Sequence, residues 1–128
     1  MSLLLDTHAV LWWSTDDSAL PVSARKYIAH YSTSIFVSAA SAWEVATKFR
    51  LGRLPGAADL VADFGGFLSR QNFQELPISA AHGIRAGSLL GPHRDPFDRM
   101  LIAQAQAENL AIVSNDFIFD HYGVRRLW

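Results

Sequence analysis

The chain contains no cysteine, which excludes disulfide bonds, thiolate metal sites and thiol catalysis. It also lacks a surplus of either charge, because 11 Lys and Arg stand against 12 Asp and Glu, for a formal net charge of −1. A chain without excess positive charge has no global attraction to nucleic acid. Any such contact would depend on a local basic rim, for which the candidates are Lys48, Arg50, Arg53, Arg94 and Arg99.

Long hydrophobic runs are absent as well. No apolar stretch approaches the roughly 20 residues that span a bilayer. The first residues, Met1–Asp6, lack a basic segment and reach an acid too early for a signal peptide. Together with the missing cysteines, these absences predict a soluble, cytoplasmic protein. Half of the 128 residues are hydrophobic, which excludes disorder and predicts one domain over residues 1–128.

Short apolar runs alternate with longer helical patterns along the whole chain. Strands are expected at residues 3–5, 35–37, 75–78, 111–113 and 124–127, and helices at 7–14, 20–30, 38–51, 57–70, 79–90 and 96–108. Such alternation is typical of an α/β/α sandwich, here with a central, mostly parallel five-stranded sheet.

Four carboxylates stand where strands end or helices begin: Asp6, Glu44, Asp98 and Asp116. In an open parallel sheet, ligands bind beyond the carboxyl ends of the strands. If these segments join one sheet, all four acids converge there, and such a cluster normally needs a cation. Carboxylate oxygens suit Mg²⁺ or Mn²⁺, so a divalent metal site is the leading hypothesis. The five histidines show no zinc-binding spacing.

Each acid also has a purely structural interpretation. Asp6 and Asp116 can serve as helix N-caps, and Glu44 can pair with Lys48 one turn later. Asp98 can simply favour the positive end of its helix. The joint pattern favours the metal site over these separate explanations.

Two further residues have both a functional and a structural interpretation. Thr7 can hydrogen-bond a metal-bound water or cap a helix, and Arg99 can contact a phosphate or pair with a neighbouring acid. With Lys48, they are the candidate substrate-positioning residues.

Several segments together resemble PIN-domain ribonucleases, in particular the VapC-type toxins of toxin–antitoxin pairs. The segments are Leu4–Ala9, Val37–Lys48, Leu51–Pro55, His93–Ala105, Val113–Asp116, Tyr122–Val124 and the closing Leu127–Trp128. The combination is specific, although each motif alone is weak. One departure is Ser114-Asn115-Asp116, where relatives often have Thr-Arg-Asp, which removes one basic group near the substrate.

The resemblance implies a PIN-like sandwich and an acidic pocket that binds Mg²⁺ or Mn²⁺. Asp6, Glu44 and Asp98 match the family's three principal acids, Asp116 its more variable fourth, and Thr7 the hydroxyl beside the first. It further implies an endoribonuclease toxin that is inhibited by a cognate VapB-like antitoxin, a homodimer and a larger toxin–antitoxin assembly.

Two other functions compete with this hypothesis. A phosphatase or phospho-acceptor domain would use Asp6 as nucleophile, but His8 stands where a dehalogenase-like enzyme needs an acid, and no Lys follows Lys48. The alternative that stays open is a catalytically weak PIN-like module that binds RNA or protein.

An apolar surface for the antitoxin is expected around two aromatic segments. Trp12 and Trp13 are adjacent and therefore point about 100° apart on a helix, so one core face cannot easily bury both. Phe64, Phe67 and Leu68 form another apolar stripe at helical spacing. We expect these residues to line a groove for an antitoxin segment.

Overall fold

The computed structural model describes residues 1–30 and 33–128. Its centre is a five-stranded sheet with the order β3-β2-β1-β4-β5, in which every neighbouring pair is parallel. The strands are β1 (Ser2–Leu5), β2 (Ser34–Ser38), β3 (Gln74–Leu76), β4 (Ala111–Val113) and β5 (Arg126–Leu127). The predicted α/β fold and its parallel sheet are confirmed.

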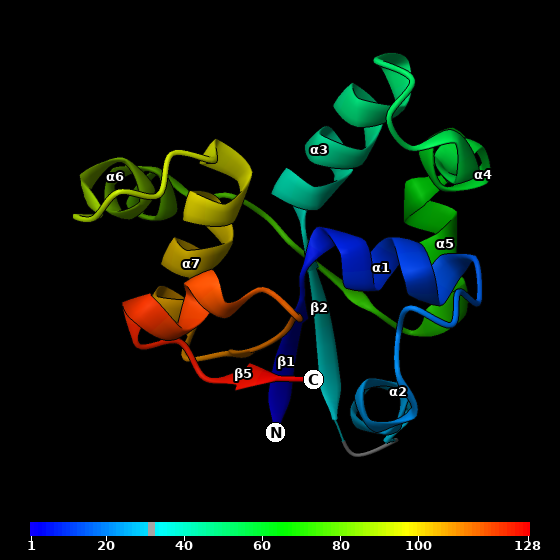
Figure 1. Ribbon diagram of the computed structural model, residues 1–128, viewed down its shortest axis with the longest axis horizontal. Coiled ribbons are helices and arrows are strands. Elements are labelled where there is room, and N and C mark those ends of the chain that lie inside the picture. The colour runs from blue at the N-terminus through cyan, green and yellow to red at the C-terminus, as the bar shows by residue number, and fades with distance from the viewer. Residues whose placement is uncertain (31–32) are drawn as a thin grey trace.

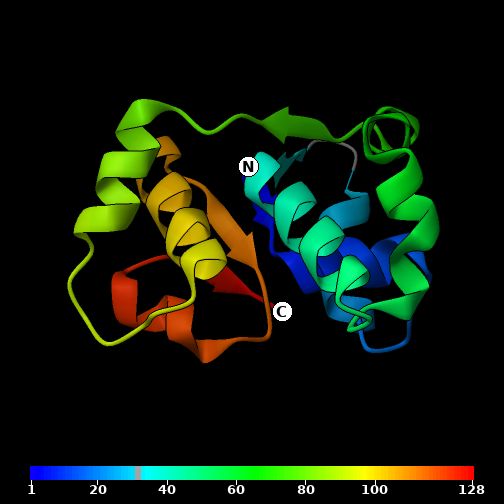
Figure 2. The same cartoon turned by 90° about the horizontal axis from the view of Figure 1, so that it is seen from above.

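Helices cover both faces of the sheet, as Figures 1 and 2 show from two directions. On one face lie α1 (Thr7–Ser14), α2 (Val22–Ala29), α4 (Ala58–Ala62) and α5 (Phe64–Gln71), and on the other lie α6 (Ala80–Ser88) and α7 (Pro96–Glu108). Helix α3 (Ala39–Arg50) continues from the end of β2. Two 3₁₀ helices complete the chain, η1 (Pro55–Ala57) and η2 (Phe117–Tyr122).

The core is divided by the sheet because side chains alternate along a strand. Leu3 and Leu5 of β1 pack with residues of α1, α2 and α5, whereas Leu4 packs with Leu101 and Ile102 of α7. Burial on both faces explains why the central strands are continuous apolar runs. No helix in the described residues is long and apolar enough to cross a membrane.

The predicted helix at 57–70 is wrong as a single element, because the chain breaks it at Asp63. This residue leaves helical geometry, and its carboxylate accepts a hydrogen bond from the backbone N–H of Gly66 at 3.1 Å. It therefore ends α4 and caps α5. The sequence does not predict η2 either, because its six residues are too short for a periodic signal.

Candidate functional site

The strand order places a crevice between β1 and β4. From β1 the chain proceeds outward to β2 and β3, and then returns across the sheet to β4 on the other side. At such a switch point the connections leave in opposite directions and open a site at the carboxyl ends of the strands. Asp6 directly follows β1, and Ser114-Asn115-Asp116 follows β4.

A cleft of about 520 Å³ lies at this point. All four predicted acids line it, and so do Thr7 and Lys48; the remaining lining residues are His8, Trp12, Asp95, Asn115 and Phe117. The structure therefore brings together the acids that the sequence predicts, from β1, α3, α7 and the loop after β4.

Asp6 is the most deeply placed acid after Glu44, with 7% of its surface exposed. Its carboxylate caps α1 by accepting a hydrogen bond from the Ala9 N–H at 2.7 Å. Burial raises the pKa of Asp6 to about 6; the hydrogen bonds from Ser114 and Ala9 act in the opposite direction, and the charges of nearby acids add to the rise. Asp6 thus caps α1 and lines the cleft at the same time.

Glu44 is 4% exposed, and both of its oxygens are engaged. The Thr7 hydroxyl lies 2.6 Å from Oε1 and also 3.1 Å from the Ser41 hydroxyl. Lys48 Nζ forms an ion pair with Oε2 one helical turn away. The ion pair that the structural alternative for Glu44 assumed is present, but it lies inside the cleft rather than on a solvated helix face.

Asp98 lies in the first turn of α7, whose N-cap is Asp95. Its Oδ2 is 3.0 Å from His93 Nε2. Burial raises the pKa of Asp98 to about 6, the hydrogen bond with His93 opposes the rise, and the charges of Asp95 and Glu44 add to it. Burial is therefore the main cause of the raised pKa in both Asp98 and Asp6.

Asp116 differs from the other three because it is exposed. Its carboxylate accepts a hydrogen bond from the Ile118 N–H at 3.0 Å and caps η2, and its own N–H donates to the Ser114 hydroxyl at 3.0 Å. Its charge nevertheless contributes to the raised pKa of Asp6, so the two acids share one electrostatic environment.

The donor set fits a hard divalent cation. Every acid in the cleft offers oxygen ligands, which Mg²⁺ and Mn²⁺ prefer. Burial is the main cause of the raised pKa values of Asp6 and Asp98, and the charges of neighbouring acids add to it. Within residues 1–30 and 33–128, no three His, Asp or Glu side chains form a ready-made metal cluster. Lys48 and His93 instead hold two of the acids.

Arg99 does not line the cleft, contrary to its expected role in positioning substrate. Its guanidinium donates to the carbonyl oxygens of Ala86 at 2.8 Å, Leu89 at 2.8 Å and His93 at 3.0 Å. Since these bonds join the end of α6 to the loop before α7, the geometry gives Arg99 a structural role in place of the phosphate contact.

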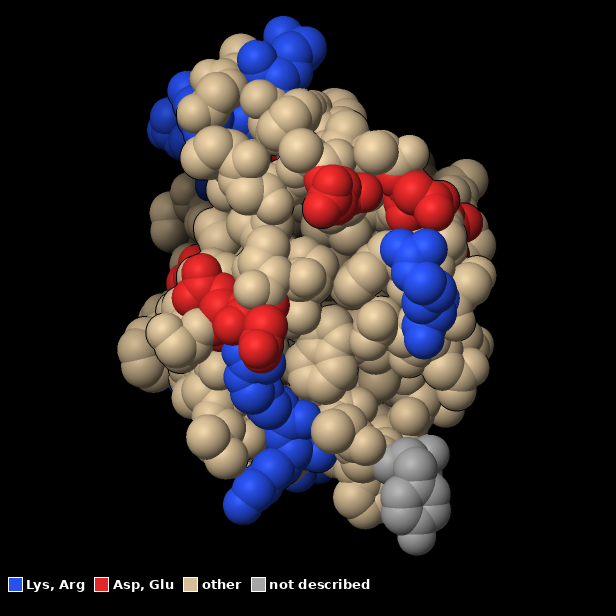
Figure 3. Space-filling view, turned by 90° about the vertical axis from the view of Figure 1, so that its right-hand side faces the viewer, with Lys and Arg blue, Asp and Glu red and all other residues tan. Residues whose placement is uncertain are grey.

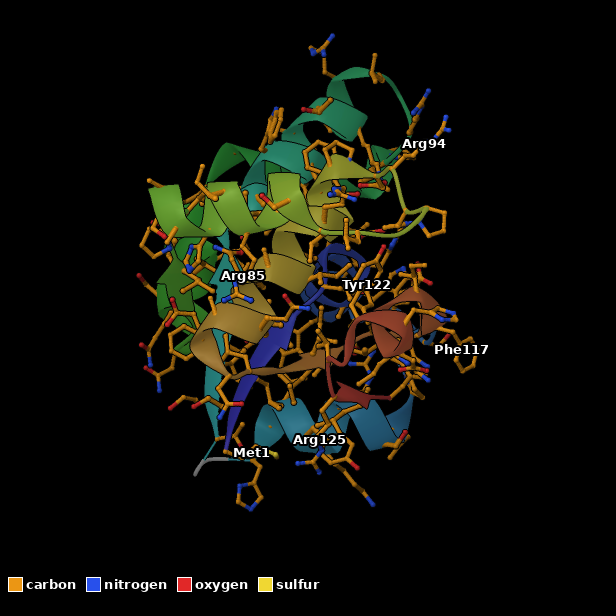
Figure 4. The ribbon with its side chains drawn as sticks, turned by 90° about the vertical axis from the view of Figure 1, so that its left-hand side faces the viewer. Met1, Arg85, Arg94, Phe117, Tyr122 and Arg125 are labelled. Carbon is orange, nitrogen blue, oxygen red and sulfur yellow. The ribbon has the colours of Figure 1, made fainter. Side chains whose placement is uncertain are left out.

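The other basic candidates, Arg50, Arg53 and Arg94, are exposed and lie outside the lining of the cleft. Figure 4 shows Arg94 at the edge of the molecule. On the face in Figure 3, basic side chains lie in separate groups, some of which adjoin acidic side chains. The absence of a continuous basic surface on that face agrees with the balanced charge of the sequence.

Sequence reasoning missed several residues of the site. His93 contacts Asp98, Ser114 bonds to Asp6, and Phe117 lines the cleft. Their positions were the available signal, because Ser114 directly follows β4 and His93 lies two residues before Asp95, the N-cap of α7. A histidine that bonds a carboxylate needs no metal-binding spacing, so the sequence pattern does not reveal His93.

The expected apolar groove is wrong for part of its lining. Phe67 and Leu68 are 8% and 4% exposed and belong to the core. Trp13 packs near Phe73 and donates to Gln71 Oε1 at 2.9 Å. Trp12 points elsewhere, to His8 and Trp128 beside the cleft. Both tryptophans are half-buried and pack against the same core cluster that contains Phe67 and Leu68, although their aromatic neighbours differ.

The family model of the PIN domain matches residues 3–124. The chain belongs to the PIN domain family. No curated protein matches it in sequence.

Solved structures with the same fold include chains of three VapBC assemblies. VapBC2 from Rickettsia felis, bound to a DNA fragment from its promoter, aligns over 100% of both chains with a TM-score of 0.65 and 17% identity. DNA-bound VapBC from Salmonella typhimurium gives a TM-score of 0.63 and 19% identity, and VapBC-1 from nontypeable Haemophilus influenzae gives 0.64 and 11%. Each of the latter two covers 98% of this chain and 96% of the other. At these identities the likeness shows the fold.

Proposed function

We propose that this PIN domain is a metal-dependent endoribonuclease that acts as the VapC-like toxin of a toxin–antitoxin pair. The observation that carries the proposal is the convergence of Asp6, Glu44, Asp98 and Asp116 on one cleft at the switch point of the sheet. Membership of the PIN family and the fold shared with VapBC chains support it.

The four acids would hold Mg²⁺ or Mn²⁺ between them. When bound, the ion makes a water nucleophilic near neutral pH and offsets charge that develops on a phosphodiester. Without a cation, burial disfavours the ionised forms of Asp6 and Asp98, as their raised pKa values show. A bound cation would favour the ionised forms. Thr7 fixes Glu44 by its 2.6 Å hydrogen bond and so keeps one oxygen in place.

Lys48 has two tasks in this proposal. In the metal-free protein its ammonium offsets the charge of Glu44. If a cation were held by that carboxylate, Lys48 would still stand at the wall of the cleft as a positive charge able to bind an RNA phosphate. His93 holds Asp98 in place through the 3.0 Å contact between its Nε2 and Asp98 Oδ2.

A VapB-like antitoxin is the proposed partner, because the similar chains come from VapBC structures. A basic side chain of such a partner would be attracted to the acidic cleft and would compete with the metal for it. A homodimer and a larger toxin–antitoxin assembly belong to the same proposal.

The deciding experiment is RNA cleavage by the purified protein with Mg²⁺ or Mn²⁺. We expect internal cuts that leave a 5′-phosphate and a 3′-hydroxyl, because water is the attacking group. Cleavage that persists in EDTA, or a 2′,3′-cyclic phosphate product, would contradict the mechanism. RNA binding without metal-dependent cleavage would favour the alternative, a catalytically weak binding module.

A further inference from the structure

Phe117 is the most exposed residue of the cleft that is large and apolar. It follows Asp116 directly, lines the cleft with the four acids, and has 69% of its surface exposed. Figure 4 shows its ring projecting outward from the body of the molecule. Single exposed apolar side chains are common, so its exposure alone assigns no role. What distinguishes Phe117 is how firmly its surroundings hold it beside the acids.

The backbone around Phe117 is fixed on both sides. The Asp116 carboxylate caps Ile118, and the Asp116 N–H donates to the Ser114 hydroxyl, both at 3.0 Å. Phe117 is therefore the first residue of a capped 3₁₀ turn rather than the tip of a loose loop. Its position relative to Asp116 is set by these bonds.

The ring itself is held by a cation. The Arg126 guanidinium carbon lies 4.4 Å from the ring centroid, within the range of a cation–π contact. Arg126 is anchored in turn by Asp120 at 3.0 Å and by the Ser114 carbonyl oxygen at 3.2 Å. The arginine thus supports the ring from one side, while much of the remaining surface faces solvent.

The residues around the Phe117 ring favour an unpaired nucleobase over an apolar protein segment as its ligand. An apolar protein segment needs a contiguous apolar surface, but Asp95, Asn115 and Asp116 line the same cleft. An unpaired nucleobase needs only an aromatic face beside a place for its phosphate, since every base can stack. Specific RNA recognition commonly uses unpaired bases stacked on aromatic side chains.

We propose that Phe117, supported by Arg126, is a stacking subsite for an unpaired nucleobase next to the phosphodiester that the acids address. The inference rests on the proposed function and adds the residue pair that would bind one base of the substrate. His8 and Trp12, whose ring centroids are 5.2 Å apart, bring a second aromatic group to the same cleft.

The test measures stacking directly, apart from cleavage. The probe is a set of short single-stranded RNAs of mixed sequence with 2-aminopurine at successive positions, because stacking quenches its fluorescence. Binding is measured with the full chain carrying Asp98→Asn in Mg²⁺, which prevents turnover. We compare Phe117 with Phe117→Tyr, which keeps an aromatic ring, and with Phe117→Leu, which keeps apolar bulk only.

We expect Phe117→Leu to lose the quenching at one probe position and to weaken binding at least about fivefold, the lower end of the range for base stacking. Phe117→Tyr should retain both. The matched control is Ile84→Ala, which truncates a 73% exposed side chain on α6 outside the cleft and should change neither.

In the active protein, Phe117→Leu should raise KM for a single-stranded substrate more than it lowers kcat. Unchanged affinity and quenching in Phe117→Leu would overturn the stacking subsite, even if the wild-type protein cuts RNA. Absence of metal-dependent RNA cleavage by the wild type would instead refute the proposed function, so the two failures are distinguishable.

Discussion

The two ends of the parallel sheet are both hollowed, and they differ in what lines them. The hollow at the amino ends of the strands is the larger, about 880 Å³ against about 520 Å³ at the carboxyl ends. Its wall contains Met1, Phe36 and Leu76, with Glu108 as its single acid. The smaller cleft contains five acids, two with strongly raised pKa values. Acids with raised pKa values that line one cleft therefore identify the candidate site better than the volume of a hollow does.

Backbone direction explains the contrast. The helices that follow β1 and β2, and also α7, begin at the carboxyl end of the sheet, where their free N–H groups favour negative charge. Asp6 and Asp95 each satisfy such groups as N-caps. The fold thus places acids at this end for structural reasons, and they line one cleft.

The largest predicted effect is the loss of RNA cleavage when an acid at the carboxyl end of the sheet is replaced. Asp6→Asn or Asp98→Asn should reduce RNA cleavage by more than about a hundredfold, beyond the loss typical of residues that only support metal ligands. Both variants should stay folded, since each removes a charge that is costly to bury. The comparison variant is Glu108→Gln at the amino end, which keeps an acceptor for His82. Equal loss of cleavage in Glu108→Gln would refute the assignment.

The second prediction concerns the pH dependence of stability without metal. The pKa values of Asp6 and Asp98 rise from 3.8 to about 6 on folding, so the folded state binds more protons than the unfolded state in this interval. The free energy of unfolding should therefore fall as pH rises from about 4 to about 6, and level off above that. Asp6 alone accounts for roughly 3 kcal/mol at most.

Urea unfolding in EDTA across this pH range measures the effect. Asp6→Asn should flatten the curve and be more stable than the wild type at pH 7. A wild-type protein whose stability increases between pH 4 and pH 6 would contradict the raised pKa values.

The third prediction is stabilisation by metal. If Mg²⁺ or Mn²⁺ binds the folded state alone, a tenfold excess over its Kd adds about 1.4 kcal/mol, which corresponds to a rise in Tm of several degrees. Thermal unfolding with and without millimolar Mn²⁺ measures it. Asp6→Asn should lose most of the shift and Glu108→Gln should keep it. An identical shift in Asp6→Asn would place the ion elsewhere.

Helix starts and strand ends could be predicted from the sequence, whereas a break within a helical pattern could not. The helices Thr7–Ser14 and Pro96–Glu108 are found at their predicted bounds, because Asp6 and Asp95 mark their starts. The strand ends located Asp6 and Asp116, and parallel topology then implied one shared edge. The break at Asp63 escaped prediction, since Asp63 both ends one helix and caps the next.

Contacts across the site were harder to foresee. Lys48 is one turn from Glu44, so their pairing follows from helical spacing. The bond between His93 and Asp98 depends on the path of the loop 89–95, which has no periodicity, and on Arg99 bonds that hold that loop. Phe117 was not identified because an exposed aromatic after an acid has no distinctive spacing.

The smallest predicted effect tests whether RNA binds at the carboxyl end of the sheet rather than at the amino end. Arg94 is exposed on the loop before α7, and Arg125 is exposed at the amino-end hollow. Both appear at the surface in Figure 4, well apart from each other. If RNA binds across the carboxyl end, Arg94→Gln removes one phosphate contact, whereas Arg125→Gln removes none. The slope of log K against log salt for a single-stranded RNA should then decrease by about 0.7 in Arg94→Gln and stay unchanged in Arg125→Gln. Because one exposed charge contributes little by itself, affinity should change only a few fold. A larger loss in Arg125→Gln than in Arg94→Gln would move the RNA path to the amino end, away from the acids, and would separate RNA binding from the cleft.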